Sequence, residues 1–301
     1  MEKTLVLIFD SSKYFFPYIK RQDIDIFDIY KKMNNIEYNI MRSLRKSDLP
    51  CTAFYGEWKR KLHDYSRIVI FDTGYTPRLA SYIVKHSKAK VFLYLWNPVK
   101  SNKRMIKYIY QSQKKISVYS YDKDDCNKYG MNFAPMTFTS SLTHPHQEIR
   151  SDLAFLGYAK DRMPQIKEYY QIFSQAGLRC NFYVVENPAV TEAEFTVSEK
   201  GLSYSEYLDM VSSSNAILDL VQGGQSGLSL RVLESLFLKK KLVTGNTRVK
   251  EYDFYRPENI FILEKNNTDG LKDFFAAPYH EVEKTIIDSY DFLNWLDIYF
   301  D

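Results

Sequence analysis

Residues 216–246, AILDLVQGGQSGLSLRVLESLFLKKKLVTGN, decide the fold class of this 301-residue chain. Residues 216–221 are a short, mainly apolar run, typical of a strand buried in a parallel sheet. Three glycines fall within residues 222–227, so the backbone can turn sharply there and lie close to a ligand. Leucines at helical spacing follow Ser229, a candidate N-cap, and residues 242–244 begin another strand. The order strand, loop, helix, strand within about thirty residues predicts a βαβ unit.

The loop of this unit has two interpretations. A glycine-rich loop that leads into a helix N-terminus is a ready site for an anion, most often a phosphate. The alternative is an ordinary crossover whose glycines only make the turn, and this stretch alone leaves both open. The lysines at residues 239–241 are expected at the C-terminal end of the helix, where cations suit the helix dipole.

Length and composition predict a two-domain globular protein. The chain is 45% hydrophobic and 26% charged, which is ordinary for a soluble protein. No run approaches the roughly 18 apolar residues that cross a bilayer, and residues 1–10 are expected to form a first strand and not a signal peptide. Three cysteines, far apart and odd in number, predict neither a disulfide framework nor a metal cluster, which favours a cytoplasmic location.

Charge is divided unequally along the chain. Residues 1–150 hold 26 Lys and Arg against 14 Asp and Glu, a net charge of +12. Residues 151–301 hold 15 against 23, a net charge of −8. This asymmetry indicates two halves with different partners. The basic half could face nucleic acid, an anionic membrane surface or an anionic substrate.

Strand and helix patterns alternate along both halves. In the first half we expect strands at 5–9, 67–71, 90–96 and 117–121, helices at 77–86 and 101–115, and a mixed helical segment at 23–47. In the second half we expect strands at 153–156, 181–185, 216–221, 242–244 and 259–263, and helices at 164–176 and 204–214. The last helix begins with a capping box of Ser203 and Glu206. Such alternation predicts parallel, doubly wound sheets that bind ligands beyond the carboxyl ends of their strands.

The polar segment at residues 140–150 separates the two halves. We therefore expect an α/β protein with two Rossmann-like domains facing across a cleft. The N-terminal domain would span residues 1–145 and the C-terminal domain residues 151–280. A helical segment at 281–301 would close the chain and could cross back to the N-terminal domain.

Four patches occur in a recognisable order: VFLYLWNPVK at 91–100, SVYSYDKDDCNKYGMNFAPMTF at 117–138, DLAFLGYAKDR at 152–162, and the stretch from SYSEYLDM at 203–210 through residue 246 to EYDFYRPENIFIL at 251–263. Together they resemble bacterial glycosyltransferases of the GT-B fold that build lipopolysaccharide and capsular polysaccharide. The resemblance implies that the C-terminal domain binds a nucleotide-sugar donor. It implies that the N-terminal domain binds a glycan or lipid-linked glycan acceptor.

The resemblance also implies a set of donor-binding residues: Lys160, Arg162, Gln225, Ser226, Gly227, Leu228, Arg231 and Glu234. Glu234 would hold the ribose hydroxyls, because a carboxylate accepts two hydrogen bonds from a diol; its alternative is a solvated helix glutamate. The backbone at 227–228 would receive the diphosphate. Arg231 would add a bidentate contact, and Arg162 and Lys160 resemble the phosphate-clamping basic residues of the family. Each of these three could instead be a surface charge.

One position departs from the family pattern. Retaining members often carry a glutamate eight residues before the ribose-binding one, and here that position is Ser226. This favours inversion, which needs a general base. Asp72 and Asp10 each follow a strand, and we prefer Asp72 because a glycine follows it in FDTGY. The alternative for Asp72 is a carboxylate that caps the next helix or binds the local backbone.

No Asp-x-Asp pair that would hold a metal–diphosphate stands in the second half; the run at residues 122–125 lies in the first. We therefore expect a metal-free reaction that requires no cofactor, with the helix dipole and basic side chains stabilising the leaving diphosphate. The basic helix at 101–115 has a solvated face or contacts an anionic membrane or a phosphorylated acceptor. Nucleic acid is not an expected partner, since no motif for it is present.

These observations predict a cytoplasmic glycosyltransferase, peripheral at the inner face of the membrane. Two alternatives stay open. A nucleotide-sugar epimerase would turn over the donor without an acceptor, and a non-catalytic sugar-nucleotide-binding module would bind without turnover.

Overall fold

The computed structural model describes residues 3–100, 102–142, 147–186, 194–220, 226–264 and 268–301. The chain forms two compact units. The first runs to Ser141 and takes in Phe292–Asp301 together with Ser226 and Gly227. The second runs from Leu142 to Asp291 apart from those two residues. The predicted helical segment at 281–301 is thus divided, with its first part in the second unit and its last ten residues in the first.

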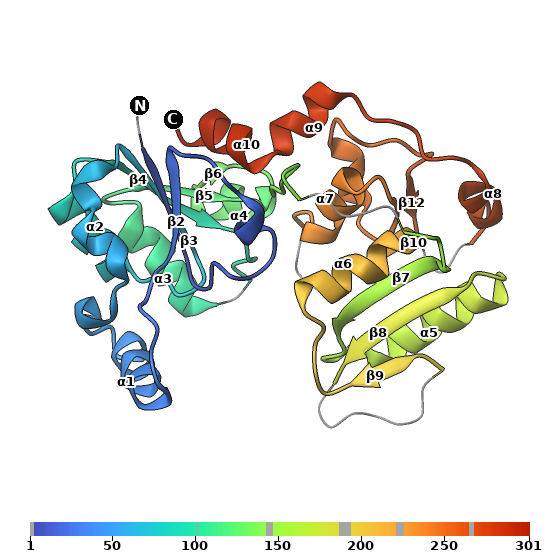
Figure 1. Ribbon diagram of the computed structural model, residues 1–301, viewed down its shortest axis with the longest axis horizontal. Coiled ribbons are helices and arrows are strands. Elements are labelled where there is room, and N and C mark those ends of the chain that lie inside the picture. Colours follow the sequence, from blue (N-terminus) through green and yellow to red (C-terminus); the bar gives the residue numbers. More distant parts are fainter. Residues whose placement is uncertain (1–2, 101, 143–146, 187–193, 221–225, 265–267) are drawn as a thin grey trace. The chain divides into compact units, whose positions relative to one another are not determined.

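The first unit is built on six parallel strands in the order β2-β1-β3-β4-β5-β6 (Figure 1). They are β1 Thr4–Ile8, β2 Ile24–Asp28, β3 Arg67–Phe71, β4 Lys90–Leu95, β5 Ser117–Ser120 and β6 Asn132–Phe133. The short edge strand β2 lies where the sequence predicted mixed helical character. Its residues IDIFD are neither a continuous apolar run nor a strict alternation, but they pair in register with β1.

Among its described residues, five α-helices belong to the first unit: α1 Asn35–Lys46, α2 Pro77–His86, α3 Lys103–Ser112, α4 Lys123–Tyr129 and α10 Phe292–Tyr299. Each of the first four begins at a polar side chain that accepts a hydrogen bond from the helix backbone. Helix α4 ends at Gly130, whose φ of 65° is left-handed and suits glycine. Short 3₁₀ helices lie at Phe16–Tyr18, Thr52–Phe54, Glu57–Arg60 and Leu62–Asp64.

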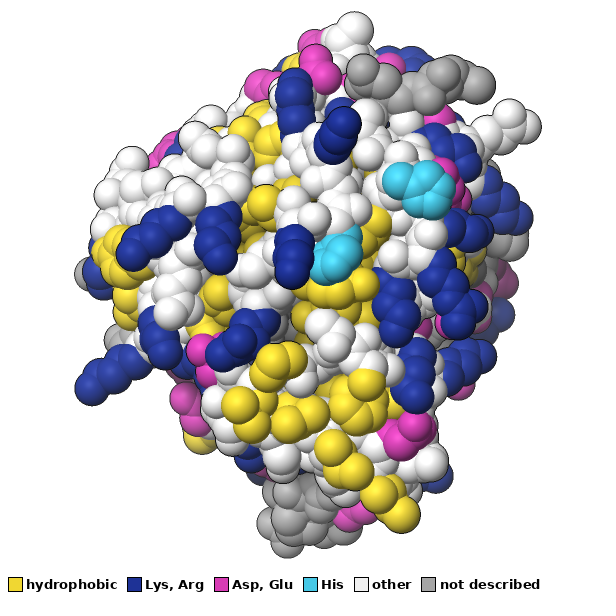
Figure 2. All heavy atoms as spheres, turned by 90° about the vertical axis from the view of Figure 1, so that its left-hand side faces the viewer, with side chains coloured by type: hydrophobic (Ala, Val, Ile, Leu, Met, Phe, Trp, Pro, Cys, Tyr) yellow, Lys and Arg dark blue, Asp and Glu magenta, His cyan; other side chains and the backbone are white. Residues whose placement is uncertain are grey.

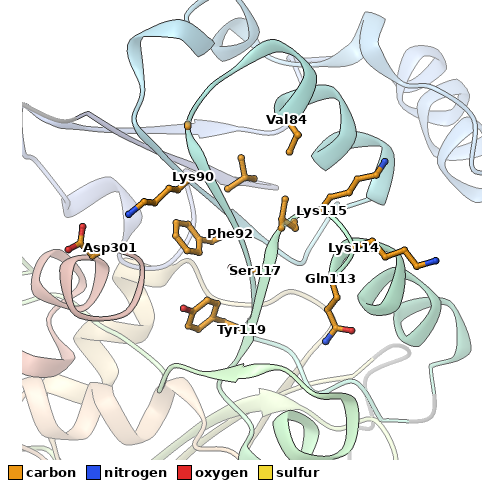
Figure 3. Close-up of a pocket in the computed structure, with 12 residues that line it drawn as sticks. Val84, Lys90, Phe92, Gln113, Lys114, Lys115, Ser117, Tyr119 and Asp301 are labelled. Carbon is orange, nitrogen blue, oxygen red and sulfur yellow. The ribbon is translucent and has the colours of Figure 1, made fainter.

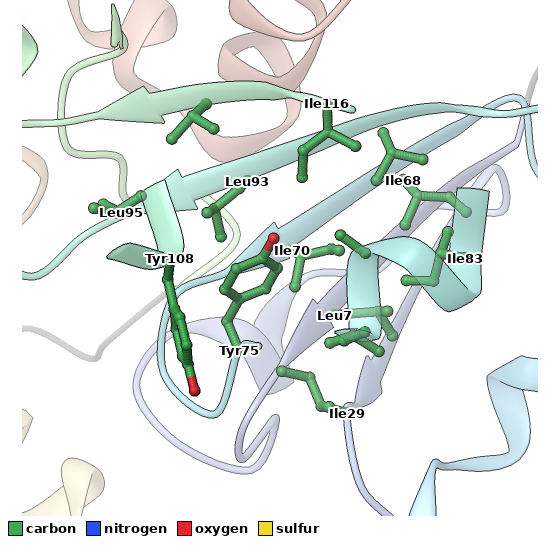
Figure 4. Packing of buried hydrophobic residues seen from close by; sticks show 14 of the residues in the cluster. Leu7, Ile29, Ile68, Ile70, Tyr75, Ile83, Leu93, Leu95, Tyr108 and Ile116 are labelled. Atoms are coloured by element: carbon green, nitrogen blue, oxygen red, sulfur yellow. The ribbon is translucent and has the colours of Figure 1, made fainter. Parts of the chain in front are cut away.

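Both faces of the first sheet are buried. Alternate residues of β4, Leu93 and Leu95 among them, face a core with Tyr75 and Tyr108 from the helical side (Figure 4). The residue between them, Tyr94, meets the ring of Trp295 on α10 at 4.8 Å. This two-sided burial explains why the strand reads as a continuous apolar run, as parallel strands covered on both faces do.

In the part of the second unit that the structure describes, six parallel strands lie in the order β12-β11-β10-β7-β8-β9. They are β7 Ser151–Tyr158, β8 Cys180–Val185, β9 Thr196–Ser198, β10 Ser214–Asp219, β11 Lys241–Thr244 and β12 Ile260–Ile262. Its helices are α5 Met163–Gln175, α6 Tyr204–Ser212, α7 Leu230–Phe237, α8 Leu271–Ala276 and α9 Lys284–Tyr290, with a 3₁₀ helix at Thr247–Glu251. Counted within the unit, this is the order 3-2-1-4-5-6 of dinucleotide-binding folds, which reverses between β7 and β10. The prediction of two Rossmann-like α/β units is confirmed.

The βαβ unit predicted at residues 216–246 is present as β10, α7 and β11. Ser229 occupies the N-cap, but its hydroxyl donates to Asp219 at 2.8 Å and caps no helix N–H. The sequence predicted Lys241 at the C-terminal end of the helix, and this prediction is wrong. Helix α7 stops at Phe237, and Lys241 begins β11. Its buried ammonium donates to the carbonyls of Phe274 and Ala277. The predicted capping box of Ser203 and Glu206 is confirmed on α6.

Candidate functional site

Arg162 lies at the switch point of the second sheet, where β7 and β10 end. It is the N-cap of α5, and its guanidinium donates to the carbonyl of Tyr158 at 2.8 Å and to that of Leu220 at 2.9 Å. The side chain therefore connects the ends of both strands. Its Nε is buried and has no hydrogen-bond partner among the described atoms. Ligands of open α/β sheets bind at such a point.

Arg231 is the second guanidinium near this edge. It is half-buried on the first turn of α7, lies over the ring of Phe155 at 5.8 Å and donates to the carbonyl of Leu156. A Cβ at Gly157 would lie 3.5 Å from its Nη2 and only 2.9 Å from the Phe155 ring, so glycine leaves room for this arrangement. Burial, and then the charge of Arg231, lower the pKa of Arg162. Neither arginine forms an ion pair with a carboxylate of the described residues.

Asp219, which the sequence did not single out, ends β10 and is buried. Its two oxygens accept hydrogen bonds from the hydroxyls of Ser229 at 2.8 Å and Thr244 at 3.0 Å. It therefore ties the end of one strand to the start of α7 and to the end of β11. Its position at the end of a strand, directly after the apolar residues 216–218, was the signal that could have identified it.

Glu234 is 2% exposed and is not a solvated helix glutamate, so that alternative is wrong. Its two carboxylate oxygens accept from the hydroxyls of Tyr204 at 2.9 Å and Tyr207 at 2.5 Å, which stand one turn apart on α6. Burial raises the pKa of Glu234, and the hydrogen bond from Tyr207 opposes that rise. The sequence did not identify these tyrosines, although their spacing in SYSEY places them on one helix face.

The backbone amides of the two residues Ser226 and Gly227, which precede α7, bind the carboxylate of Asp122. The backbone N–H groups of Ser226 and Gly227 each donate to Asp122 Oδ2 at 2.9 Å, and the Ser226 hydroxyl donates to its Oδ1. Burial raises the pKa of Asp122, but these hydrogen bonds outweigh burial and hold it below the ordinary value. A Cβ at Gly227 would lie 2.5 Å from the Tyr121 ring, so only glycine fits there. Leu228, which follows, is buried.

Of the two remaining predicted donor-site residues, Lys160 and Gln225, the structure describes only the first. Lys160 is exposed in the loop after β7, with a left-handed φ of 50°. Gln225 lies outside the described residues.

In the first unit, Asp10 and Asp72 lie at the switch point of the sheet, after the neighbouring strands β1 and β3. Asp10 is half-exposed; it accepts from the hydroxyl of Ser12 at 2.5 Å and from its N–H at 3.1 Å, and it pairs with Lys13 at 3.2 Å. The hydroxyl of Ser12 holds the pKa of Asp10 below its ordinary value. Asp10 is therefore ionised and a weak proton acceptor near neutral pH.

Asp72 differs because it is only 5% exposed. Burial raises the pKa of its carboxyl to about 7, although Asn97 Nδ2 donates to both oxygens at 3.1 and 3.2 Å. Thr76 caps the next helix, so the alternative that Asp72 is that cap is wrong. Backbone N–H groups nearby do donate to Asp72, in line with the other alternative. A carboxyl with a pKa near neutrality can take up a proton during a reaction.

A separate hollow of about 630 Å³ lies at the opposite, amino-terminal edge of the first sheet (Figure 3). Phe92, Ser117 and Tyr119 line it together with Lys114 and Lys115 after α3. Because open α/β sheets bind ligands at the carboxyl ends of their strands, we do not assign this hollow to the site.

Within the described ranges, no group of three or more His, Cys, Asp or Glu side chains is arranged to hold a metal ion. The run at residues 122–125 instead forms the N-cap and first turn of α4. No helix in the described part of the chain is both long and apolar enough to cross a membrane.

No family model matches the chain, and no curated protein matches it. Among solved structures it is similar to a DNA-modifying β-glucosyltransferase studied with and without uridine diphosphoglucose, at 12% identity and a TM-score of 0.48, covering 91% of this chain and 88% of that one. It is also similar to UDP-GlcNAc 2-epimerase from Neisseria meningitidis bound to UDP-GlcNAc, at 11% identity and a TM-score of 0.46 over 91% and 90% of the chains. It is similar, too, to the phage T4 enzyme in complex with UDP and Mn²⁺, at 13% identity and a TM-score of 0.45, covering 92% of this chain and 89% of that one. At these identities and TM-scores the likenesses carry no conclusion about activity or ligands.

Proposed function

We propose that this protein is a GT-B glycosyltransferase that moves a sugar from a nucleotide-sugar donor to a lipopolysaccharide or other surface-glycan acceptor. One observation carries the proposal. Arg162 and Arg231 stand near the switch point of the second sheet without a carboxylate partner among the described residues, and Arg162 Nε is unsatisfied. A diphosphate would supply the missing charge and acceptors, because phosphate oxygens accept from guanidinium groups in bidentate geometry.

The loop before α7 would receive the same diphosphate. Its amides at Ser226 and Gly227 already bind a carboxylate, so they are able to hold an anion. In the proposed complex a phosphate oxygen replaces Asp122 on these amides, and Leu228 and Lys160 complete the surroundings. Positive charge from arginines and helix dipole then stabilises the leaving diphosphate without a metal ion. We expect activity to survive EDTA treatment; loss of activity that Mg²⁺ or Mn²⁺ restores would contradict this part.

Glu234 would bind the ribose. Each of its oxygens accepts one tyrosine hydrogen bond and keeps a second lone pair, which a hydroxyl of the ribose diol can use. The tyrosines fix the orientation of the carboxylate in the absence of donor.

Asp72 would act as the general base. Asp72 takes the proton of the acceptor hydroxyl while the hydroxyl oxygen forms a bond to the anomeric carbon of the donor sugar. The bond between that carbon and the diphosphate oxygen breaks at the same time, so the configuration at the anomeric carbon is inverted. Asn97 positions the carboxylate through its two hydrogen bonds. The ionised Asp10 is the second candidate. The basic N-terminal half fits a lipid-linked acceptor at the cytoplasmic face of a membrane.

The test is a panel of UDP-, GDP-, dTDP- and CMP-sugars, with donor binding measured by calorimetry and product formation measured with glycan acceptors. Binding that Glu234→Ala and Arg162→Ala abolish, with transfer to an acceptor, supports the proposal. If no donor binds, the proposal fails. An isomerised donor without acceptor would identify an epimerase, and binding without any turnover would identify a binding module.

A further inference from the structure

Helix α1 carries an apolar face that the first unit leaves uncovered. Nine large hydrophobic side chains are exposed in the described residues, and four of them lie within residues 36–49: Ile36, Tyr38, Ile40 and Leu49. Ile36 is 72% and Ile40 49% exposed, and their spacing of four places them one above the other on the helix. Only Met41 of α1 is buried. We call Ile36 and Ile40 the α1 face, because Tyr38 points to another side of the helix and Leu49 lies beyond its C-terminal end.

Cations surround the α1 face. Lys32, Arg42 and Lys46 are exposed, and none forms an ion pair with an acid of the described chain. The acid on α1, Glu37, accepts from the backbone of the N-cap and pairs with Lys31 at 3.0 Å. Figure 2 shows hydrophobic side chains gathered low on this side of the first unit, over α1, with Lys and Arg side chains around them. The surface is therefore apolar at its centre and positive at its margin.

The helix is held in place at its C-terminal end. The guanidinium of Arg104, on α3, donates to the carbonyls of Arg45 and Lys46. Arg78, on α2, donates to the carbonyl of Asp48 and pairs with its carboxylate at 3.5 Å. Two guanidiniums thus fix the end of α1, so its outward face has a defined orientation.

We propose that the α1 face docks on an anionic membrane surface. Its isoleucines enter the headgroup layer, and Lys32, Arg42 and Lys46 contact lipid phosphates. Interfacial helices have this combination of an apolar stripe and flanking cations. The excess of unpaired positive charge favours anionic lipid over an apolar protein partner. This inference deepens the proposed membrane location and rests on it. The sequence predicted the membrane contact on the helix at 101–115, but Arg104 of that helix binds α1, and we place the contact on α1 itself.

The test uses the full chain and sedimentation with vesicles of phosphatidylcholine alone or mixed equally with phosphatidylglycerol. We expect binding only to the mixed vesicles. Ile36→Glu with Ile40→Glu should weaken it about tenfold or more, because each isoleucine loses the free energy of burial. The matched control is Ile298→Glu on α10, where an isoleucine is 55% exposed, and it should bind as wild type. Arg42→Glu with Lys46→Glu should weaken binding and reduce its dependence on salt.

Three results would overturn the inference: no binding of wild type to mixed vesicles, unchanged binding of the isoleucine variant, or a solution dimer that this variant dissociates without vesicle binding. Circular dichroism confirms that each variant is folded. Donor affinity, measured without vesicles, reports on the proposed transferase separately, so a failure of docking leaves that proposal standing.

Discussion

Asp72 and Asp10 are carboxylates at one edge of one sheet, yet their surroundings shift their pKa values in opposite directions. Asp10 is half-exposed and is held ionised by the hydroxyl of Ser12. Asp72 is buried, and desolvation raises its pKa to about 7. Separation of two titratable groups in this way is how a site assigns its acid and base.

We expect Asp72→Asn to lower kcat about a hundredfold or more, the usual contribution of a general base, while donor Kd stays unchanged. In the wild type the rate should rise with pH through about 7, as Asp72 loses its proton. Steady-state kinetics and donor calorimetry check both statements. Asp10→Asn is the control; if it alone abolishes transfer, Asp10 is the base.

The same carboxyl makes stability depend on pH. The pKa of Asp72 in the folded state, about 7, lies above its ordinary 3.8, so the folded state holds the proton more tightly. This contribution is complete below pH of about 4 and is lost as pH rises through 7. The Asp72→Asn side chain cannot ionise. The free energy of unfolding of this variant minus that of wild type should therefore be larger at pH of about 8 than at about 5, by a few kcal/mol. Denaturant unfolding at both pH values measures this, and an equal difference at both would contradict it.

The paired arginines allow a direct test of the donor site. Arg162→Ala and Arg231→Ala should each weaken donor binding about 10- to 100-fold, because a hydrogen bond to a charged group contributes about 1.5–3 kcal/mol. The matched control is Arg179→Ala, an exposed arginine of the same unit that pairs with Asp152 at 3.1 Å. Donor affinity unchanged in both arginine variants would remove Arg162 and Arg231 from the site.

At the scale of elements, α6 and α7 are joined through one buried carboxylate. Tyr204 and Tyr207 on α6 both donate to Glu234 on α7, and Asp219 ties the start of α7 to two strands. The helix that begins at the glycine loop is therefore fixed at its start and at its middle.

Tyr207→Phe leaves one oxygen of Glu234 without its hydrogen bond in a buried place. We expect this to lower the free energy of unfolding by about 1–3 kcal/mol. Tyr204→Phe is the comparison, and it should cost less because its hydrogen bond is only partly buried. Urea unfolding of the two variants measures the difference. An equal or reversed order would show that Tyr207 does not hold the carboxylate.

At the scale of the whole molecule, the chain completes its first unit with its last residues. Trp295 on α10 is fully buried, meets the ring of Tyr94 edge-to-face and donates its indole N–H to the carbonyl of Pro135 at 2.8 Å. The first unit therefore needs residues from both ends of the described chain.

Trp295→Ala should destabilise the first unit by about 3–5 kcal/mol, the usual cost of removing a buried tryptophan. Calorimetry should show the transition of the first unit moving to lower temperature while that of the second unit stays. Ile298→Ala, at an exposed position on the same helix, should leave both in place. A shift of the second transition alone would contradict the role of α10 in the first unit.

Much of the fold could be predicted from the sequence because its signals are local. The apolar runs at β3, β4 and β10, the capping box of α6 and the glycine-rich stretch before α7 all depend on neighbouring residues. Alternation of these elements was enough to predict parallel sheets. The edge strand β2 was missed because its residues, IDIFD, form neither a continuous apolar run nor a strict alternation.

The sequence by itself determined the two α/β halves, the strand ends at which Asp10, Asp72 and Arg162 stand, and the unequal charge. Only the tertiary structure decided that Asp72 is buried, that two tyrosines hold Glu234 and that Asp122 lies on the amides of the glycine loop. It also decided that the face of α1 is left open. The physical reason is that spacing along a chain fixes where a side chain points on its own element. Burial and partners depend on which distant elements pack against it.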